Sequence, residues 1–311
     1  MKYGFMTLNV EENIGCYLRT RILQEDTRTG ELVNELSLLD YEVVNKAEAR
    51  KKKEEREKQT KQYFKRRSPM EFVWVLYKLS ANLMEELSAK YVAMLFYLAT
   101  YYSYDGGLST GKKPIHKRQL PELLRVSEKT AYRFWNAVQR AGIGIESEDG
   151  ILSLSEKFFR KGYLPPKKEL AMMADDDMYM ARGYIKSIRH LYETAEKSSR
   201  NYLGYLFQLL PFVNREYNIV CHNPLETELE KIQPMNFGEV CAALGYDAEN
   251  SNRLLRELLK LKFTAYGKTW GGVRYVVTDS VSDRSTYKLF LNPRVLYAGS
   301  HTKEVEVLGQ F

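Results

Sequence analysis

Apolar residues between positions 88 and 154 recur with spacings that predict three helices followed by a hairpin. After Ser88, a good N-cap residue, an apolar stripe with helical period predicts the first helix, and its members are Val92, Leu95, Phe96, Leu98 and Ala99. A short second helix over 117–124 and a third over 128–140 follow after tight connections. Residues 145–154 predict the hairpin. This order of elements is typical of a helix-turn-helix with a wing.

The third predicted helix has an apolar face and a polar face. Its apolar face comprises Ala131, Phe134, Trp135 and Val138. In a helix-turn-helix, the second helix of the motif lies in the major groove and offers its N-terminal half to the edges of the bases. We therefore expect the outward-facing polar side chains to contact DNA. These candidates are Ser127, Lys129, Thr130, Arg133 and Asn136.

The same layout occurs a second time along the chain. An offset of 120 residues places Val240 on Leu120 and Arg253 on Arg133, so core and groove-facing positions keep their chemical type. An offset of 111 matches the first helix with residues 206–209, and an offset of 137 matches residues 152–154 with 289–291. The groove-facing candidates of the second motif are Asp247, Asn250, Asn252, Arg253 and Arg256.

Two residues distinguish the first motif from the second. Pro121 lies in the short second helix, where proline is tolerated in the first turn alone. Arg125 stands where the second motif has Gly245 in its turn. We therefore expect the first turn to differ from the second, and the first motif to be either the weaker reader of bases or an interaction module.

A longer hairpin follows the second motif. Between residues 263 and 291, strands over 273–277 and 287–291 predict a second wing. Wings reach the DNA backbone or the minor groove beside the recognition helix, so basic side chains in this region are candidates for phosphate contacts. They are Lys262, Lys268, Arg274 and Arg284, for which simple surface charge is the alternative interpretation.

The segments outside the two motifs have their own patterns. Residues 1–45 predict an N-terminal β-hairpin, with strands over 16–22 and 32–39 around a turn at Gly30. Residues 46–70 hold a tract with eleven Lys/Arg and four Glu between positions 46 and 67, too polar to bury a face, which is either a solvated linker or an arm that follows phosphates. Residues 71–165 and 166–311 are the two predicted winged-helix domains.

Residues 162–198 lie between the two motifs. Pro165 and Pro166 favour a linker or the start of a strand. The run of aspartates at 175–177 is interpreted as a solvated acidic cap near a helix N-terminus, because consecutive carboxylates point in different directions and do not form a metal site.

The charge of the chain favours a polyanionic partner. Its 311 residues carry 47 Lys/Arg and 40 Asp/Glu, a net charge of +7, which points toward nucleic acid or an anionic surface. No apolar run reaches the roughly 18 residues that a membrane helix needs, and no hydrophobic stretch follows a basic start. We expect no membrane partner and a cytoplasmic location.

Sites for enzymatic chemistry are not indicated. The three cysteines form no CxxC pair, and Cys221 beside His222 lacks a second pair of zinc ligands. Residues 106–112 have the spacing of a phosphate-binding GxxxxGK loop, but Lys113 follows where Ser or Thr must hold magnesium. The four histidines are scattered, which argues against a rolling-circle nickase. We expect no enzymatic activity, no cofactor and no metal.

The C-terminal segment resembles the RepL-type replication proteins of Gram-positive plasmids and phages. The resemblance lies in residues 287–299, which contain an Asn-Pro turn, and in the following Lys303-Glu304 and terminal stretch 308–311. It covers about residues 253–311. Near the N-terminus, Thr29-Gly30-Glu31 is also similar to these proteins. It implies a winged-helix fold and binding to an origin or operator, without enzymatic activity. Two units in one chain depart from that family and are similar to double-winged-helix replication initiators, which bind repeated origin sequences and recruit host factors.

The sequence predicts an α+β, mainly α, protein with two tandem winged-helix units, an N-terminal β-hairpin and a basic arm. The predicted function is sequence-specific binding of double-stranded DNA by a phage or plasmid protein, as replication initiator or as transcription regulator. The alternative is an interaction module that binds a host factor through its winged helices. The sequence is also compatible with a homodimer and with contacts to host replication or transcription proteins.

Overall fold

The computed structural model contains helices and several small antiparallel sheets, in a mixed α+β arrangement. The chain divides into two compact units, Met1–Ser68 and Pro69–Phe311. The basic tract 46–67, Pro165, Pro166, the aspartates 175–177 and Arg284 lie outside the described residues. The structure describes residues 5–14, 17–26, 32–37, 71–79, 86–111, 113–162, 178–265, 267–278, 286–299, 307 and 311.

The N-terminal unit contains a three-stranded antiparallel sheet in the order β1-β2-β3. The strands are β1 (Phe5–Ile14), β2 (Tyr17–Asp26) and β3 (Leu32–Ser37). The pairing of β2 with β3, with Arg21 opposite Ser37, confirms the predicted hairpin. Strand β1 was missed, although Met6, Leu8 and Val10 alternate with polar residues as a strand requires.

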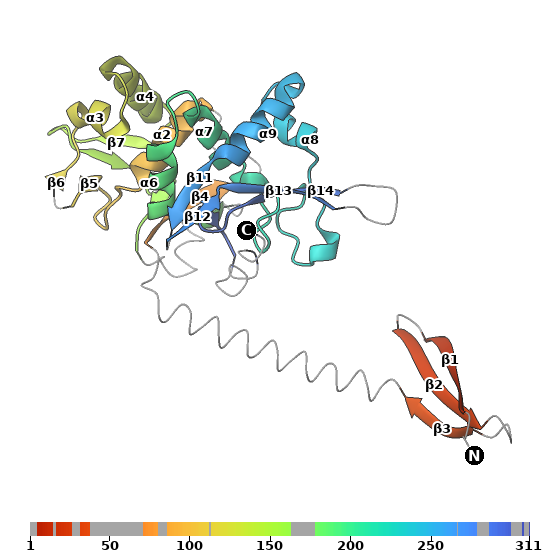
Figure 1. Cartoon of the computed structure of the whole chain (residues 1–311). Coiled ribbons are helices and arrows are strands. Elements are labelled where there is room, and N and C mark those ends of the chain that lie inside the picture. Colours follow the sequence, from red (N-terminus) through yellow and green to blue (C-terminus); the bar gives the residue numbers. More distant parts are fainter. Residues whose placement is uncertain are drawn as a thin grey trace. The chain divides into compact units, whose positions relative to one another are not determined.

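The first half of the larger unit begins with a strand, continues with three helical segments and ends in short strands (Figure 1). Helix α4 has the predicted bounds, because Ser127 caps its start by accepting a hydrogen bond from the backbone N–H of Thr130, and Gly142 follows its end at φ +68°. The elements are β4 (Phe72–Lys78), α2 (Ala89–Ala99), β5 (Ser109–Thr110), β6 (Lys113–Pro114), η1 (Lys117–Gln119), α3 (Leu120–Leu124), α4 (Glu128–Arg140), β7 (Gly144–Glu146), β8 (Leu152–Leu154) and β9 (Phe159–Arg160).

The second half repeats this order with additions. The 111-residue offset carries the start of α2 to Arg200, the first residue of α7, and the 120-residue offset carries the start of α4 to Ala248. The elements are β10 (Met178–Tyr184), α6 (Ile185–Thr194), α7 (Arg200–Gln208), η2 (Leu210–Phe212), η3 (Leu229–Lys231), α8 (Phe237–Ala243), η4 (Ala248–Asn250), α9 (Ser251–Lys260), β11 (Lys262–Ala265), β12 (Lys268–Gly271), β13 (Val273–Thr278), β14 (Thr286–Leu291) and β15 (Leu296–Tyr297).

Each half contains a hairpin whose second strand bonds to a segment before the helix pair. In the first half, β7 pairs with β8, and the N–H of Leu108 donates to the carbonyl of Leu152. In the second half, β13 pairs with β14, and the N–H of Val220 donates to the carbonyl of Leu289. The two halves therefore share one connectivity of helices and strands.

A four-stranded sheet joins the two halves in the order β15-β10-β4-β9. Its central strands, β4 and β10, are antiparallel over their full length, with Phe72 opposite Tyr184 and Lys78 opposite Met178. Each central strand is flanked by the last short strand of its own half. Antiparallel neighbours are related by a local twofold axis, so β4 and β10, one strand from each half, meet about such an axis.

Two additions in the second half were not predicted. One is α6 (Ile185–Thr194), which directly follows β10, the strand that pairs with β4. Ile185, Ile188 and Leu191 are buried at helical spacing, so the period that indicates α6 is present in the sequence. The other is the separate hairpin of β11 and β12, which lies between α9 and β13, inside the region predicted as the second wing.

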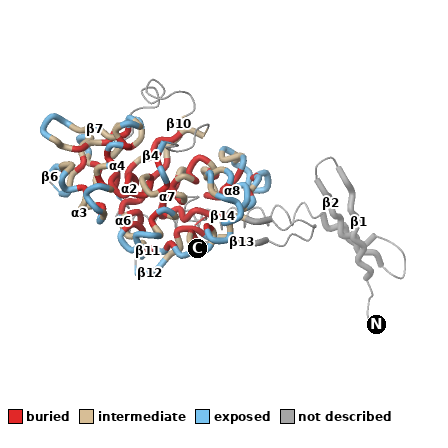
Figure 2. The backbone as a smooth tube through the Cα atoms, turned by 90° about the horizontal axis from the view of Figure 1, so that it is seen from above, coloured by how far each residue is buried: buried red, intermediate tan, exposed pale blue. Residues whose placement is uncertain are grey.

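Helices α2 and α7 pack against each other in a core that runs through both halves (Figure 2). The rings of Phe96 and Phe207 stack with centroids 4.1 Å apart. Gly204 permits this close approach, because a Cβ atom on it would collide with the backbone carbonyl of Ala89. One continuous core therefore holds the two halves together.

Candidate nucleic-acid interface

Helix α4 presents its polar candidates to solvent. Ser127, Lys129, Arg133 and Asn136 are exposed, whereas the apolar face of the helix is buried. Thr130 is half-buried, and its hydroxyl lies 2.9 Å from that of Ser127. Thr130 therefore takes part in capping the helix as well as bordering its exposed face.

Helix α9 has a corresponding exposed face. Asn252, Arg253 and Arg256 are exposed, on the side of the helix away from the buried Leu254 and Leu258. In Figure 1, α4 and α9 lie on the upper side of the view, on either side of α2 and α7. The repeat thus places two arginine-bearing helix faces on the surface.

Asp247 and Asn250 are exposed but bonded locally. The Oδ1 atom of Asp247 accepts from the N–H of Glu249 at 3.0 Å, and its Oδ2 atom accepts from the side-chain amide of Asn250 at 2.7 Å. These bonds cap the start of η4, so both side chains contribute to helix initiation.

The basic candidates beyond α9 are divided between two hairpins. Lys262 and Lys268 lie on the inserted β11–β12 hairpin, whereas Arg274 lies on β13. All three are exposed. The region predicted as one long wing therefore consists of two separate basic hairpins.

The two turns before the candidate recognition helices have the same conformation. Arg125 has φ 54° and ψ 46°, and Gly245 has φ 61°, both in the left-handed region. The expected difference between the turns is therefore wrong. Pro121 lies in the first turn of α3, where the missing N–H removes no helical hydrogen bond.

Contacts from the second half hold Arg125 in this conformation. Arg200 is buried, and its Nη1 atom donates to the carbonyls of Leu124 at 2.9 Å and Arg125 at 3.4 Å. The hydroxyl of Tyr192 also donates to Leu124 O at 2.9 Å. Burial raises the pKa of Tyr192 to about 12, so the phenol keeps this proton at neutral pH. These bonds satisfy the carbonyls at the C-terminus of α3, where a cation is also favoured by the helix dipole.

Sequence reasoning missed Arg200. Under the 111-residue offset it lies opposite Ala89, so the repeat comparison contains no indication of its role. Its guanidinium carbon lies 4.3 Å from the centroid of the Tyr192 ring, which adds a cation–π contact. Arg200 therefore positions the turn that precedes α4.

We expect the substitution Arg125→Gly to raise the free energy of unfolding by about 0.5–1 kcal/mol. A non-glycine residue in the left-handed region costs about 1–2 kcal/mol, and the greater freedom of glycine in the unfolded chain cancels part of that gain. Urea denaturation would measure the difference. The matched variant is Gly245→Ala, whose added Cβ meets no atom within 4 Å and which should lose a similar amount. A lower midpoint for Arg125→Gly would contradict the strain assigned to this turn.

Other motifs considered in the sequence lie in ordinary structural positions. Gly111, at φ +67°, occupies the turn between β5 and β6, so the GxxxxGK-like stretch belongs to a small hairpin. His222 pairs with Glu239 at 3.2 Å. Burial raises the pKa of the Cys221 thiol to about 11, which disfavours the thiolate that binds metals. In the described part of the chain, no three His, Cys, Asp or Glu residues cluster as metal ligands.

Comparisons of this chain with protein-family models, with curated proteins and with solved structures found no match. Across the described ranges, none of the helices has the length and apolar content needed to cross a membrane. The functional interpretation therefore depends on the geometry of the exposed faces.

Proposed function

We propose that residues 71–165 and 166–311 form two tandem winged-helix units. The support is the connectivity shared by the two halves, in which a helix, a segment that bonds to the hairpin, a helix pair and the hairpin itself follow in order. In such a unit, the second helix of the pair enters the major groove and the hairpin lies beside it. By this assignment, α4 and α9 are the recognition helices.

The proposed function is sequence-specific binding of double-stranded DNA by a phage or plasmid protein, as replication initiator or transcription regulator. The observation that carries it is the pair of exposed polar faces on α4 and α9, with Arg133 and Arg253 at matching positions. Arginine pairs bidentately with guanine in the major groove. The resemblance of residues 253–311 to RepL-type proteins favours a mobile-element role, and host replication or transcription proteins are the proposed further partners.

The antiparallel pairing of β4 with β10, one strand from each half, favours DNA sites with two inverted half-sites. Protein symmetry is mirrored in the symmetry of the operator, and the spacing of the half-sites follows the separation of the recognition helices. Because α2 and α7 share one core, a single chain should require one fixed spacing. Two blocks of preferred bases are therefore expected in each bound site.

A selection experiment tests this function. The full chain would be incubated with a pool of random-sequence duplexes, washed with salt, and the retained DNA sequenced over several rounds. We expect enrichment of one site with two base blocks at constant separation. Retained DNA without sequence enrichment over the starting pool would reject specific recognition.

The alternative, an interaction module that binds a host factor through the same helices, predicts apolar recognition faces. The exposed face of α4 carries polar and charged candidates. On α9, among the described residues, Leu259 is the large apolar side chain exposed to solvent, with a relative accessibility of 40%. This distribution favours DNA over a protein partner for these two faces.

A further inference from the structure

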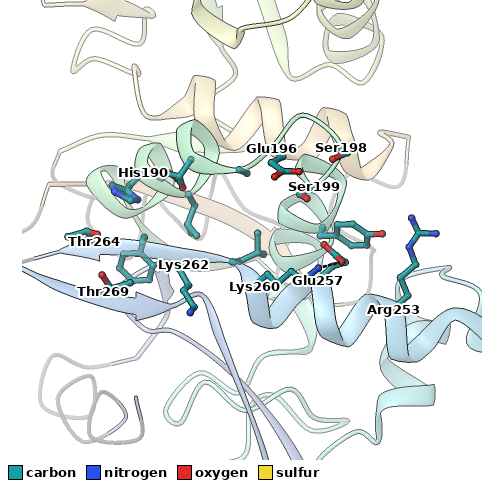
Figure 3. Close-up of a pocket in the computed structure, with 16 residues that line it drawn as sticks. His190, Glu196, Ser198, Ser199, Arg253, Glu257, Lys260, Lys262, Thr264 and Thr269 are labelled. Carbon is teal, nitrogen blue, oxygen red and sulfur yellow. Dashed lines mark hydrogen bonds and ion pairs between the residues drawn. The ribbon is translucent and has the colours of Figure 1, made fainter.

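A cleft of about 610 Å³ lies beside α9. The connection between α6 and α7 forms one wall, α9 forms the opposite wall, and the β11–β12 hairpin closes one end (Figure 3). The polar residues that line it are His190, Thr194, Glu196, Ser198, Ser199, Tyr202, Arg253, Glu257, Lys260, Lys262, Thr264 and Thr269.

The lining of this cleft suits a phosphate group. Arg253, Lys260 and Lys262 supply three cations, and six of the lining side chains carry hydroxyl groups. Lys260 and Glu257 form an ion pair, with Nζ 2.6 Å from Oε1, and Glu196 is the second carboxylate, so three cations stand against two carboxylates in the cleft. Cationic side chains together with hydroxyl donors are the usual partners of backbone phosphates.

The cleft lies between α9 and the α6–α7 region, and that region also contacts the first helix pair. Arg253 belongs both to the exposed face of α9 and to the cleft. On the other side, the same α6–α7 region reaches the turn before α4, because Arg125 Nη1 donates to the carbonyl of Glu193 at 3.4 Å and Arg200 bonds Leu124. The α6–α7 region therefore spans from one candidate recognition helix to the other.

We propose that this cleft binds phosphate groups of the DNA backbone between the two base blocks contacted by α4 and α9. The proposal rests on the proposed function, since a duplex that engages both helices has to cross the segment between them. It assigns phosphate contact to residues outside the helix-turn-helix pattern, namely Lys260 and the hydroxyls of Ser198 and Ser199. Glu196, exposed at the rim, opposes the phosphate charge.

The decisive experiment uses the duplex selected by the full chain and a second duplex of the same sequence with uncharged methylphosphonate linkages between the two blocks. We expect the wild-type chain to bind the second duplex about tenfold more weakly, with a shallower dependence of log K on log salt, because each lost phosphate contact removes about 0.9 from that slope. The double variant K260Q/K262Q should bind the natural duplex more weakly and lose little further affinity on the uncharged one. Both residues are exposed, so unchanged thermal denaturation is expected.

Control variants separate the cleft from general surface charge. Lys157→Gln removes an exposed lysine outside the cleft and should keep the full difference between the two duplexes. Glu196→Gln should strengthen binding of the natural duplex by about two- to fivefold, since it removes a repulsive charge near a phosphate, whereas Glu230→Gln, an exposed carboxylate on η3, should leave it unchanged.

The outcomes distinguish this proposal from the function on which it rests. Wild-type protein that prefers the selected sequence but binds both duplexes equally would overturn the cleft assignment and leave DNA recognition standing. Failure to select any sequence would overturn both. Titration calorimetry with inorganic phosphate and with ATP is the last measurement. If ATP binds at micromolar concentration, K260Q/K262Q abolishes that binding, and the wild-type chain binds both duplexes equally, the cleft binds a free phosphorylated compound instead of DNA.

Discussion

Replacing Gly204 with alanine should lower the free energy of unfolding of the larger unit by about 3 kcal/mol. On helix propensity alone the same change would stabilise α7 by about 1 kcal/mol. The collision outweighs that gain, because the added Cβ would meet the backbone carbonyl of Ala89, which has no rotamer by which to move away. Helices α2 and α7 would have to separate, and the stacked pair Phe96–Phe207 would separate with them.

Urea denaturation followed by far-UV circular dichroism would measure this loss. Gly238→Ala is the matched control, because Gly238 is exposed on α8 and its added Cβ would approach the side chain of Asn236 and no backbone carbonyl. The control should be as stable as wild type or up to about 1 kcal/mol more stable, because alanine favours the helix. If Gly204→Ala were as stable as this control, the close packing of α2 on α7 would be wrong.

Removing both candidate base-reading arginines should weaken binding of the selected duplex by about 2–6 kcal/mol, because each bidentate arginine–guanine contact contributes about 1–3 kcal/mol. Arg133 and Arg253 lie on different helices, α4 and α9, so their effects should add. Each single substitution to alanine should also relax base preference in one block of the site and leave the other block unchanged.

Binding titrations on the selected duplex and on a random duplex would check this prediction, with selection repeated for each single variant. Arg140→Ala is the control, because Arg140 is exposed in the last turn of α4, away from the N-terminal half that enters the groove. Lys262→Ala should weaken binding to all sequences alike. Equal losses on specific and random DNA for Arg253→Ala would remove its base-reading role.

Most of the local structure around α4 could be predicted because its determinants are local. The helix begins at Glu128 and ends at Arg140 because Ser127 caps its first turn and glycines follow its last. Its buried face follows from the spacing of apolar residues. The same reasoning located α9, where Arg253 is exposed at the position that the repeat assigns to it.

The missed elements had weaker or competing patterns. Helix α6 follows directly after β10, without the turn residues that usually separate two elements, so neither element was predicted over residues 178–194. The β11–β12 hairpin turns at Gly267 within a region already assigned to a longer wing. In both cases the sequence contains a local pattern that fits the element, but the pattern does not mark where the element begins and ends.

The sequence by itself determined two helix-pair motifs, their apolar faces and the polar side chains left to face solvent. It did not determine the conformation of the turn at Arg125, which depends on Arg200 and Tyr192 from the other half of the unit. Nor did it determine the cleft beside α9, whose walls come from segments about sixty residues apart along the chain. Helix caps and periodicity act over a few residues, whereas a left-handed arginine or a shared cleft exists when distant segments pack together and satisfy each other's hydrogen bonds.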